Sequence, residues 1–266
     1  MIFVIIKIQI ITDGKNEESI PIVMTFREKL RRRLTEQNQM SESFVLSLIL
    51  AFSGGFQDAY TYIVRQHVFA NAQTGNIVLM STNFLAGQWH KGLRYLLPVL
   101  AFIFGVFIAE QLDHFFHASV KFHWRQLVLI LEILILIGVG FIPLYLNTLA
   151  NTLVSFSCAM QVQAFRTVGG NAYASTMCIG NLRSGTQALS TYLRERDRRY
   201  LLQVKDYFGV ILVFALGAGA GGNICKDLGE RSIWISACIL VIGCLLMGLD
   251  RPLLLAVQQK ETECKE

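Results

Sequence analysis

Asp58 is the side chain whose position most strongly indicates chemistry, because it lies about 14 residues into an apolar stretch that begins near Phe44. A carboxylate at such depth in a hydrocarbon layer costs roughly 2.5–3.5 kcal/mol, so it should face the interior of a helix bundle and have a partner. Two interpretations stay open. Asp58 either binds a proton or cation that is coupled to transport, or it holds helices together through hydrogen bonds.

The sequence around Asp58 occurs in two related copies. The first copy reads Phe52-Ser-Gly-Gly-Phe-Gln-Asp-Ala-Tyr60, followed by Phe69-Ala-Asn-Ala-Gln-Thr-Gly-Asn76. The second copy, about a hundred residues later, covers residues 156–166 and 173–181 and also ends in Gly-Asn. Each copy combines an apolar helix with a polar break and a second, more polar segment. Internal repeats with broken helices in matching positions indicate a transporter-like binding site.

The Gly-Asn pairs at the two breaks, Gly75-Asn76 and Gly180-Asn181, mark the expected start of a short helix. Free N–H groups and the dipole at a helix start suit an anion or a carboxylate, and unwound carbonyls just before them suit a cation. Alternatively, the glycine permits a tight helix entry and the asparagine caps it. The sequence leaves both interpretations open.

Arg183 lies within the second polar segment, where a buried guanidinium would need a carboxylate or a ligand anion. Asp58 is the most attractive internal partner, and Arg166 offers the same chemistry from the end of the preceding apolar run. Alternatively, Arg183 extends to the membrane interface and only sets orientation. Glu132 has apolar neighbours on both sides and is interpreted as a neutral carboxyl group.

Together these side chains predict a solute pathway between the two copies, with Asp58 as the coupling residue and Arg183 as the anion contact. One acid, one or two arginines and several amides suit a small polar or anionic solute. The candidate solute-binding residues are Gln57, Asp58, Tyr60, Gln73, Thr74, Asn76, Gln163, Arg166, Asn181 and Arg183.

The elements that must position these residues are apolar helices. Hydrophobic residues make up 53% of the 266-residue chain and charged residues 16%, whereas a soluble domain carries about a quarter charged residues. The pattern predicts an all-α, polytopic transmembrane bundle of about eight spans, of which the second and sixth are short or broken. The predicted spans are Phe44–Val64, Ala72–Ala86, Tyr95–Leu112, Gln126–Leu146, Leu149–Phe165, Ala172–Leu193, Tyr207–Ile224 and Ile233–Leu249.

Basic residues lie between the apolar runs, which is typical of membrane orientation signals and not of a nucleic-acid-binding face. Eight spans place the basic clusters at 27–33, 90–94, 194–199 and 260–265 on the cytoplasmic side. If the second and sixth segments were re-entrant, Lys91 and Arg94 would lie outside, so the basic residues favour eight spans by one loop. The predicted organisation is a cytoplasmic extension at 1–42, a membrane domain at 43–250 and a cytoplasmic tail at 251–266. Its tandem halves, 43–147 and 148–250, would then run in the same direction as parallel repeats.

No pattern predicts an enzyme, a metal or a cofactor. The six cysteines are scattered without a C-x-x-C pair. His114 and His117 lie in a connection that lacks the fixed geometry of a metal site, and nucleotide-binding and hydrolase motifs are absent. The glycines from Gly217 to Gly221 predict a close helix-packing face. Pro143 is expected to kink the fourth span.

The first-copy motif, Gly55-Phe-Gln-Asp-Ala-Tyr60 followed by Thr74-Gly-Asn76, resembles the signature of the YoaK family of uncharacterised bacterial multi-pass membrane proteins. The resemblance covers about residues 43–250. The second copy departs from the family pattern, with Gln161, Ala164 and Ile179 in place of Gly, Asn and Thr. The resemblance implies an integral protein of the bacterial cytoplasmic membrane and no established activity.

Two functions therefore remain. The first is a small-solute secondary transporter or permease with its pathway between the repeat halves. The alternative is a non-transporting membrane scaffold or a lipid- or ligand-binding protein that uses the same polar residues for packing. The lipid bilayer is the expected partner in both cases, nucleic acid is not, and homo-oligomerisation stays open.

Overall fold

The computed structural model describes residues 44–116, 124–168, 171–173 and 175–249. These ranges are helical apart from a two-stranded antiparallel ladder, β1 (Thr167–Val168) with β2 (Asn171–Ala172). The all-α prediction is confirmed for this part of the chain. The predicted extension at 1–42, the tail at 251–266 and the side chain of His117 lie outside the described residues.

Each predicted span overlaps one helix. The first and the last predicted spans have the same bounds as their helices. The two short 3₁₀ turns are η2 (Leu144–Leu146) and η3 (Gly229–Ser232). The helices are α3 (Phe44–Val64), α4 (Gln73–Leu85), α5 (Trp89–Phe116), α6 (Trp124–Val139), α7 (Asn147–Ala164), α8 (Cys178–Glu195), α9 (Arg198–Leu228) and α10 (Ile233–Leu249).

Two boundaries differ from the prediction for local reasons. Helix α6 ends at Val139 and is not kinked at Pro143, which is extended and precedes the turn η2. A proline at this position has no N–H to continue the helix. Helix α8 begins at Cys178, six residues later than predicted, because Asn171 and Ala172 pair with β1.

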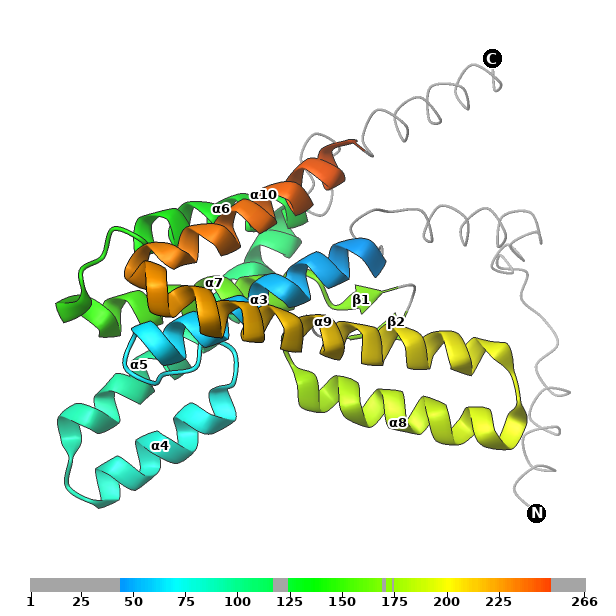
Figure 1. Cartoon of the computed structure of the whole chain (residues 1–266), viewed down its shortest axis with the longest axis horizontal. Coiled ribbons are helices and arrows are strands. Elements are labelled where there is room, and N and C mark those ends of the chain that lie inside the picture. Colours follow the sequence, from blue (N-terminus) through cyan, green and yellow to red (C-terminus); the bar gives the residue numbers. More distant parts are fainter. Residues whose placement is uncertain (1–43, 117–123, 169–170, 174, 250–266) are drawn as a thin grey trace, which may run out of the picture. The chain divides into compact units, whose positions relative to one another are not determined.

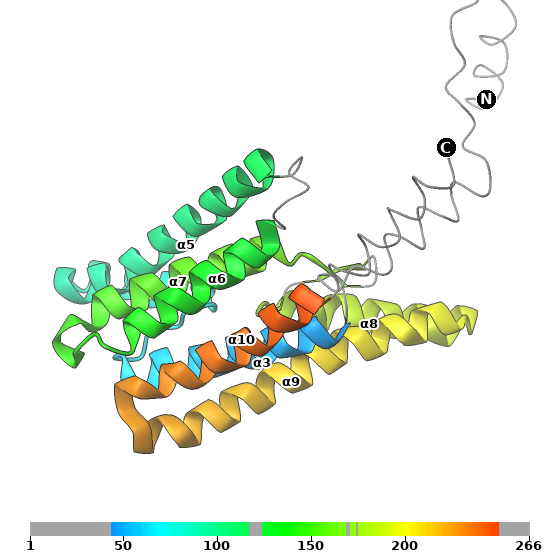
Figure 2. The ribbon, with the colours of Figure 1, turned by 90° about the horizontal axis from the view of Figure 1, so that it is seen from above.

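Helix α3 packs closely along α9, and α5 packs along α7 (Figures 1 and 2). A side chain at Gly217 would overlap the backbone of Phe52, and one at Gly221 would lie 3.0 Å from the Cβ of Ala59. Gly105 of α5 approaches the backbone of Phe156 on α7 in the same way. The predicted glycine packing face on α9 is therefore confirmed, and its partner is α3.

The two halves of the chain do not run in the same direction, because α3 and α7 are antiparallel. Gln57, in the middle of α3, contacts Cys158 near the end of α7, whereas Arg65, just after α3, contacts Asn147 and Asn151 at the start of α7. The prediction of parallel halves is therefore wrong.

The physical reason lies in the segment after α3, which turns back along the helix. The backbone N–H of Asn71 donates to Asp58 Oδ1 at 2.8 Å. Asp58 is six residues before the end of α3, about 9 Å at 1.5 Å per residue. Helix α4 therefore begins beside the middle of α3. Helix α4 forms an antiparallel hairpin with α5, and α5 runs parallel to α7. Because α7 is antiparallel to α3, α5 is antiparallel to α3 as well. Helix α4 therefore runs in the same direction as α3.

The basic clusters are separated by this arrangement. The turn between α4 and α5 lies at the end of the bundle where α3 ends, and the turn between α8 and α9 lies where α3 begins, because α9 is parallel to α3. Lys91 and Arg94 are therefore not on the same side as residues 194–199, contrary to the prediction.

Helix α10 is antiparallel to α3. Ser236 is hydrogen-bonded to Ser53, and Gly243 lies beside Leu46, so Phe44 and Leu249 lie at the same end of the bundle.

In the described part of the chain, two helical segments are long and apolar enough to cross a membrane, Trp89–Phe116 and Arg198–Gly248. The second of these comprises α9, η3 and α10. Large apolar side chains are also exposed on several helices, including Phe104, Leu134 and Leu245, which are 55%, 59% and 64% exposed. Exposed apolar surface of this extent marks a face that contacts lipid or protein.

Candidate functional site

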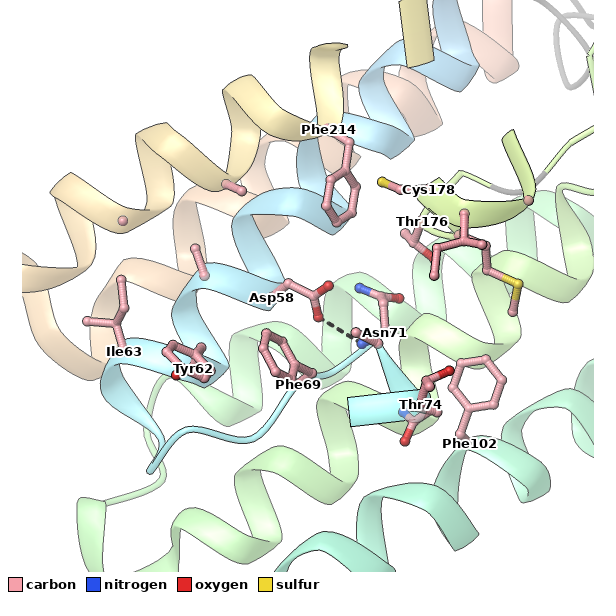
Figure 3. Close-up of a pocket in the computed structure, with 18 residues that line it drawn as sticks. Asp58, Tyr62, Ile63, Phe69, Asn71, Thr74, Phe102, Thr176, Cys178 and Phe214 are labelled. Carbon is pink, nitrogen blue, oxygen red and sulfur yellow. Dashed lines mark hydrogen bonds between the residues drawn. The ribbon is translucent and has the colours of Figure 1, made fainter. Parts of the chain in front are cut away.

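A cavity of about 720 Å³ lies where the starts of α4 and α8 meet the middle of α3 and the facing side of α9 (Figure 3). Phe102 of α5 closes part of its wall. Most lining side chains are apolar, and four of them are aromatic: Tyr62, Phe69, Phe102 and Phe214. The polar lining side chains are Asp58, Asn71, Gln73, Thr74, Thr176 and Cys178.

Asp58 projects from α3 into this cavity and is only 8% exposed. Its carboxylate accepts a hydrogen bond from the backbone N–H of Asn71. The cavity lining contains no lysine, arginine or histidine, and no salt bridge to Asp58 is formed within the described ranges. A buried carboxylate is normally paired, and the described partners of Asp58 are hydrogen-bond donors of Asn71 and the backbone of Ala70. A proton or a cationic ligand would neutralise its charge.

Two further polar side chains of the lining have unused hydrogen-bonding capacity. Asn71 is 5% exposed and donates to the carbonyl of Gly54 at 3.3 Å, while its Oδ1 has no partner among the described residues. Thr176 is 6% exposed and its Oγ1 is also without a partner there. Buried polar atoms are usually satisfied, so these two atoms indicate where a polar ligand would bind.

Helices α4 and α8 both begin at the cavity. The residues that precede them, Ala72 and Met177, provide no side-chain cap. The first N–H groups of an α-helix have no partner within the helix, and they carry partial positive charge. Helix α4 runs from here toward the end of α3, and α8 runs toward its beginning, so the two starts approach the cavity from opposite directions (Figure 1).

Asn76, in the first turn of α4, holds the returning segment in place. Its Nδ2 donates to the carbonyl of Phe69 at 2.7 Å, and its Oδ1 accepts from the N–H of Phe69 at 3.1 Å. Gly75 lies against the ring of the same phenylalanine. Asn76 is therefore a positioning residue that fixes one aromatic wall of the cavity, and Asn181, in the corresponding turn of α8, is also buried.

Gln57, next to Asp58, faces away from the cavity into a buried polar cluster. Its Nε2 lies 3.0 Å from Glu132 Oε1 and 3.1 Å from the hydroxyl groups of Ser53 and Ser236, and its Oε1 accepts from Cys158 Sγ. All five residues are fully buried. Glu132 has no cationic partner in the described part of the chain, which agrees with its interpretation as a neutral carboxyl group. The contacts of Gln57 are therefore structural.

Arg65, the residue directly after the apolar helix α3, is charged and yet fully buried. Its Nε donates to the hydroxyl of Tyr60 at 2.7 Å, and its two amino groups donate to the carbonyls of Val139 and Ile142 and to Asn147 Oδ1. A fifth, longer contact reaches a carbonyl at 3.4 Å. Because carbonyls at a helix end carry partial negative charge, Arg65 stabilises the end of α6 and joins it to α3 and α7.

The remaining predicted residues lie away from the cavity. Gln163 and Arg166 both contact Glu110 near the end of α7, and the charged pair there is about half exposed. Arg183 is exposed on α8 and does not line the cavity. Of the ten predicted residues, the structure brings Asp58, Gln73 and Thr74 together at the cavity, but not Asp58 and Arg183. Their role as solute contacts stays a prediction.

Four important residues escaped the sequence analysis: Arg65, Asn71, Thr176 and Phe214. Arg65 resembles an ordinary charged residue at the end of an apolar run. Asn71 and Thr176 each precede the asparagine of a Gly-Asn pair by five residues. This shared spacing was the one signal in the sequence that could have identified them.

No group of three or more His, Cys, Asp or Glu residues that could hold a metal occurs within the described ranges. A family model for a protein of unknown function, DUF1275, matches residues 46–246. Neither the curated proteins nor the solved structures provided a match. The family match covers both copies of the motif and every residue that lines the cavity.

Proposed function

Since the chain belongs to the DUF1275 family of proteins of unknown function, we propose that it is a multi-pass membrane protein that carries a small solute through the cavity around Asp58. This is the secondary transporter or permease function expected from the repeated motif. The observation that carries the proposal is that both breaks in the repeat converge on one cavity, although they are about a hundred residues apart in the sequence.

The membrane part of the proposal rests on exposed apolar helices and two segments of sufficient length to cross a bilayer. Helices α4 and α8 begin beside the middle of α3, so we infer six crossing helices and two helices that start within the membrane, and not eight full spans. Backbone at mid-membrane depth is tolerated only where it is buried in protein or lines a cavity. The segments before α4 and α8 meet this condition, because residues of both line the cavity.

The arrangement of the helices further supports two related halves, α3–α6 and α7–α10, that are inverted and not parallel. The contact of α3 with α9 matches that of α5 with α7, and the α4–α5 hairpin matches the α8–α9 hairpin. Corresponding helices α3 and α7 are antiparallel. Inverted repeats with interrupted helices that begin at a central site are a recurring transporter architecture.

The orientation follows from the basic residues. The cluster at 194–199 lies at the end of the bundle where Phe44 and Leu249 also lie, and the sequence before Phe44 is basic at 27–33. Lysine and arginine accumulate on the cytoplasmic side. We therefore place both termini in the cytoplasm, with the protein in the cytoplasmic membrane.

The scaffold alternative draws its support from the cluster around Gln57, which is buried and whose hydrogen bonds join α3 to α6 and α10, although Glu132 Oε2 has no partner among the described residues. It does not account for Asn71 and Thr176, which line the cavity and each have a buried polar atom without a described partner. The cavity therefore favours a ligand-binding function.

Screening the purified protein against a panel of small metabolites tests the proposal. A ligand at 100 times its dissociation constant stabilises the native state by about 2.7 kcal/mol, so binding should raise the thermal unfolding temperature. We expect at least one ligand to stabilise the wild type and not Asp58→Asn. If no solute stabilises the protein and Asp58→Asn merely unfolds earlier, the polar residues serve packing and the scaffold function is correct.

A further inference from the structure

We infer that the ligand of this cavity is a zwitterion with an apolar body, whose ammonium group binds Asp58 and whose anionic group binds the start of α8. The inference rests on the proposed solute-binding function and names the class of solute. It departs from the small polar or anionic solute that the sequence predicts.

The cationic group is assigned to Asp58, which is buried, lines the cavity and lacks a cationic partner within the described ranges. Asn71 also lines the cavity, with its side-chain nitrogen toward Asp58 and its unpartnered Oδ1 on the far side (Figure 3). An ammonium group has three donors and no acceptor, so it can donate to the Asp58 carboxylate. Tyr62 and Phe69, whose rings stack on each other with their centroids 4.8 Å apart, also line the cavity.

The anionic group is required by the start of α8. Met177 supplies no side-chain cap, and residues 177–180 line the cavity. Thr176, directly before them, contributes a buried hydroxyl group without a described partner. A helix start carries about half a positive charge and readily binds carboxylate or phosphate. The start of α4 differs, because the segment before it already donates to Asp58 through Asn71.

The charges of the site are nearly balanced. Asp58 carries one negative charge, and the two helix starts together contribute about one positive charge. A ligand with only a positive charge would meet the starts of α4 and α8 without a counter-charge, and a ligand with only a negative charge would be repelled by Asp58. A zwitterion satisfies both parts of the site, and the aromatic rings of Phe102 and Phe214 enclose its apolar body.

Two sources supply this chemistry, a free amino acid with an apolar side chain and a lipid with a zwitterionic amine headgroup. Both present an ammonium group, an anionic group and an apolar body. The experiment therefore uses soluble probes and defined lipids side by side.

Cys178 lines the cavity and reports its occupancy, because a bound ligand should shield the thiol from alkylation. The protein is reconstituted in bilayers without amine lipids, and alkylation of Cys178 is followed by peptide mass spectrometry. The three probes share one apolar body and differ in charge. L-phenylalanine carries both charges, phenethylamine carries only the positive charge, and 3-phenylpropionate carries only the negative charge. A parallel sample contains phosphatidylethanolamine and no soluble probe.

We expect L-phenylalanine to protect Cys178 at a concentration at least about tenfold lower than either singly charged probe, because a hydrogen bond to a charged group contributes roughly tenfold or more in affinity. In Asp58→Asn, L-phenylalanine should lose this advantage over 3-phenylpropionate. The exposed Asp227→Asn on α9 is the matched control and should retain it. Protection by phosphatidylethanolamine alone, with no further effect of L-phenylalanine, would identify the lipid as the source.

Equal protection by all three probes, or stronger protection by a singly charged one, would overturn the zwitterion and leave the solute site intact. A Cys178 that no probe and no lipid protects would contradict the inference and, if the metabolite panel also yields no ligand, the proposed function with it. The ranking of probes on the wild type does not depend on any variant folding correctly.

Discussion

Replacing Arg65 by methionine should destabilise the protein more than any other single substitution considered for this chain. The guanidinium donates to four uncharged acceptors beyond Tyr60, among them the carbonyls of Val139 and Ile142 at the end of α6. Methionine removes the cost of burying a charge, but it leaves these acceptors without donors. Each buried unsatisfied acceptor costs roughly 1–3 kcal/mol, so the lost hydrogen bonds outweigh the relief.

We expect Arg65→Met to lower the free energy of unfolding by about 3–5 kcal/mol, comparable with breaking a buried charged contact. The thermal unfolding temperature of the purified protein measures this loss. Arg65→Lys keeps the charge but offers only three donors, and should fall between the wild type and Arg65→Met.

Arg166→Met is the matched control for this prediction. Arg166 pairs with Glu110 at a site where both side chains are about half exposed, and such surface ion pairs contribute about 1 kcal/mol or less. Equal losses for Arg65→Met and Arg166→Met would show that Arg65 does not join the helices as the structure indicates.

The second large effect is expected at Gly217, where α9 approaches α3. A Cβ atom there would overlap the backbone carbonyl of Phe52, and a backbone atom cannot move aside as a flexible side chain can. Gly217→Ala should therefore separate the two helices and cost about 1–3 kcal/mol of stability, the usual range for overpacking. Thermal unfolding again provides the measurement.

Gly219→Ala is the control on the same helix, because a side chain at Gly219 would meet nothing within 4 Å. Alanine is a better helix former than glycine by up to about 1 kcal/mol, so this variant should be as stable as the wild type or more stable. If Gly217→Ala were equally harmless, α3 and α9 would not be in the close contact described.

The positions of the helices could largely be predicted from the sequence, because long apolar runs specify them directly. Helices α3 and α10 occupy the predicted ranges. Helices α5 and α9 extend beyond their apolar cores in both directions, since the more polar turns before and after each core continue the same helix. The glycine face of α9 was predictable for a similar reason, as its spacing is local.

The direction of α4 could not be predicted, because it depends on the path of the seven-residue segment between Arg65 and Asn71. An extended chain of this length reaches about 20 Å, which is enough either to continue outward or to turn back along α3. The return is fixed by the hydrogen bond from Asn71 to Asp58, a tertiary contact that no periodicity encodes. That contact reverses the relation between the halves.

The composition of the site was predictable only in part for the same reason. Asp58 stands out as an acid in an apolar helix, and Gln73 and Thr74 follow from the repeated motif. Phe102 and Phe214 resemble any other apolar residues of α5 and α9, and only the packing of these helices places them at the cavity.

The most direct test of the central claim, a water-accessible solute cavity beside Asp58, is the alkylation rate of Cys178 in the membrane-embedded protein. Cys158 and Cys225 are buried and serve as internal references in the same sample. A small water-soluble thiol reagent should modify Cys178 much faster than either reference, and a stabilising ligand from the metabolite panel should slow this reaction. A Cys178 that reacts as slowly as Cys158 would mean that water and solutes do not enter the cavity, which would contradict the account.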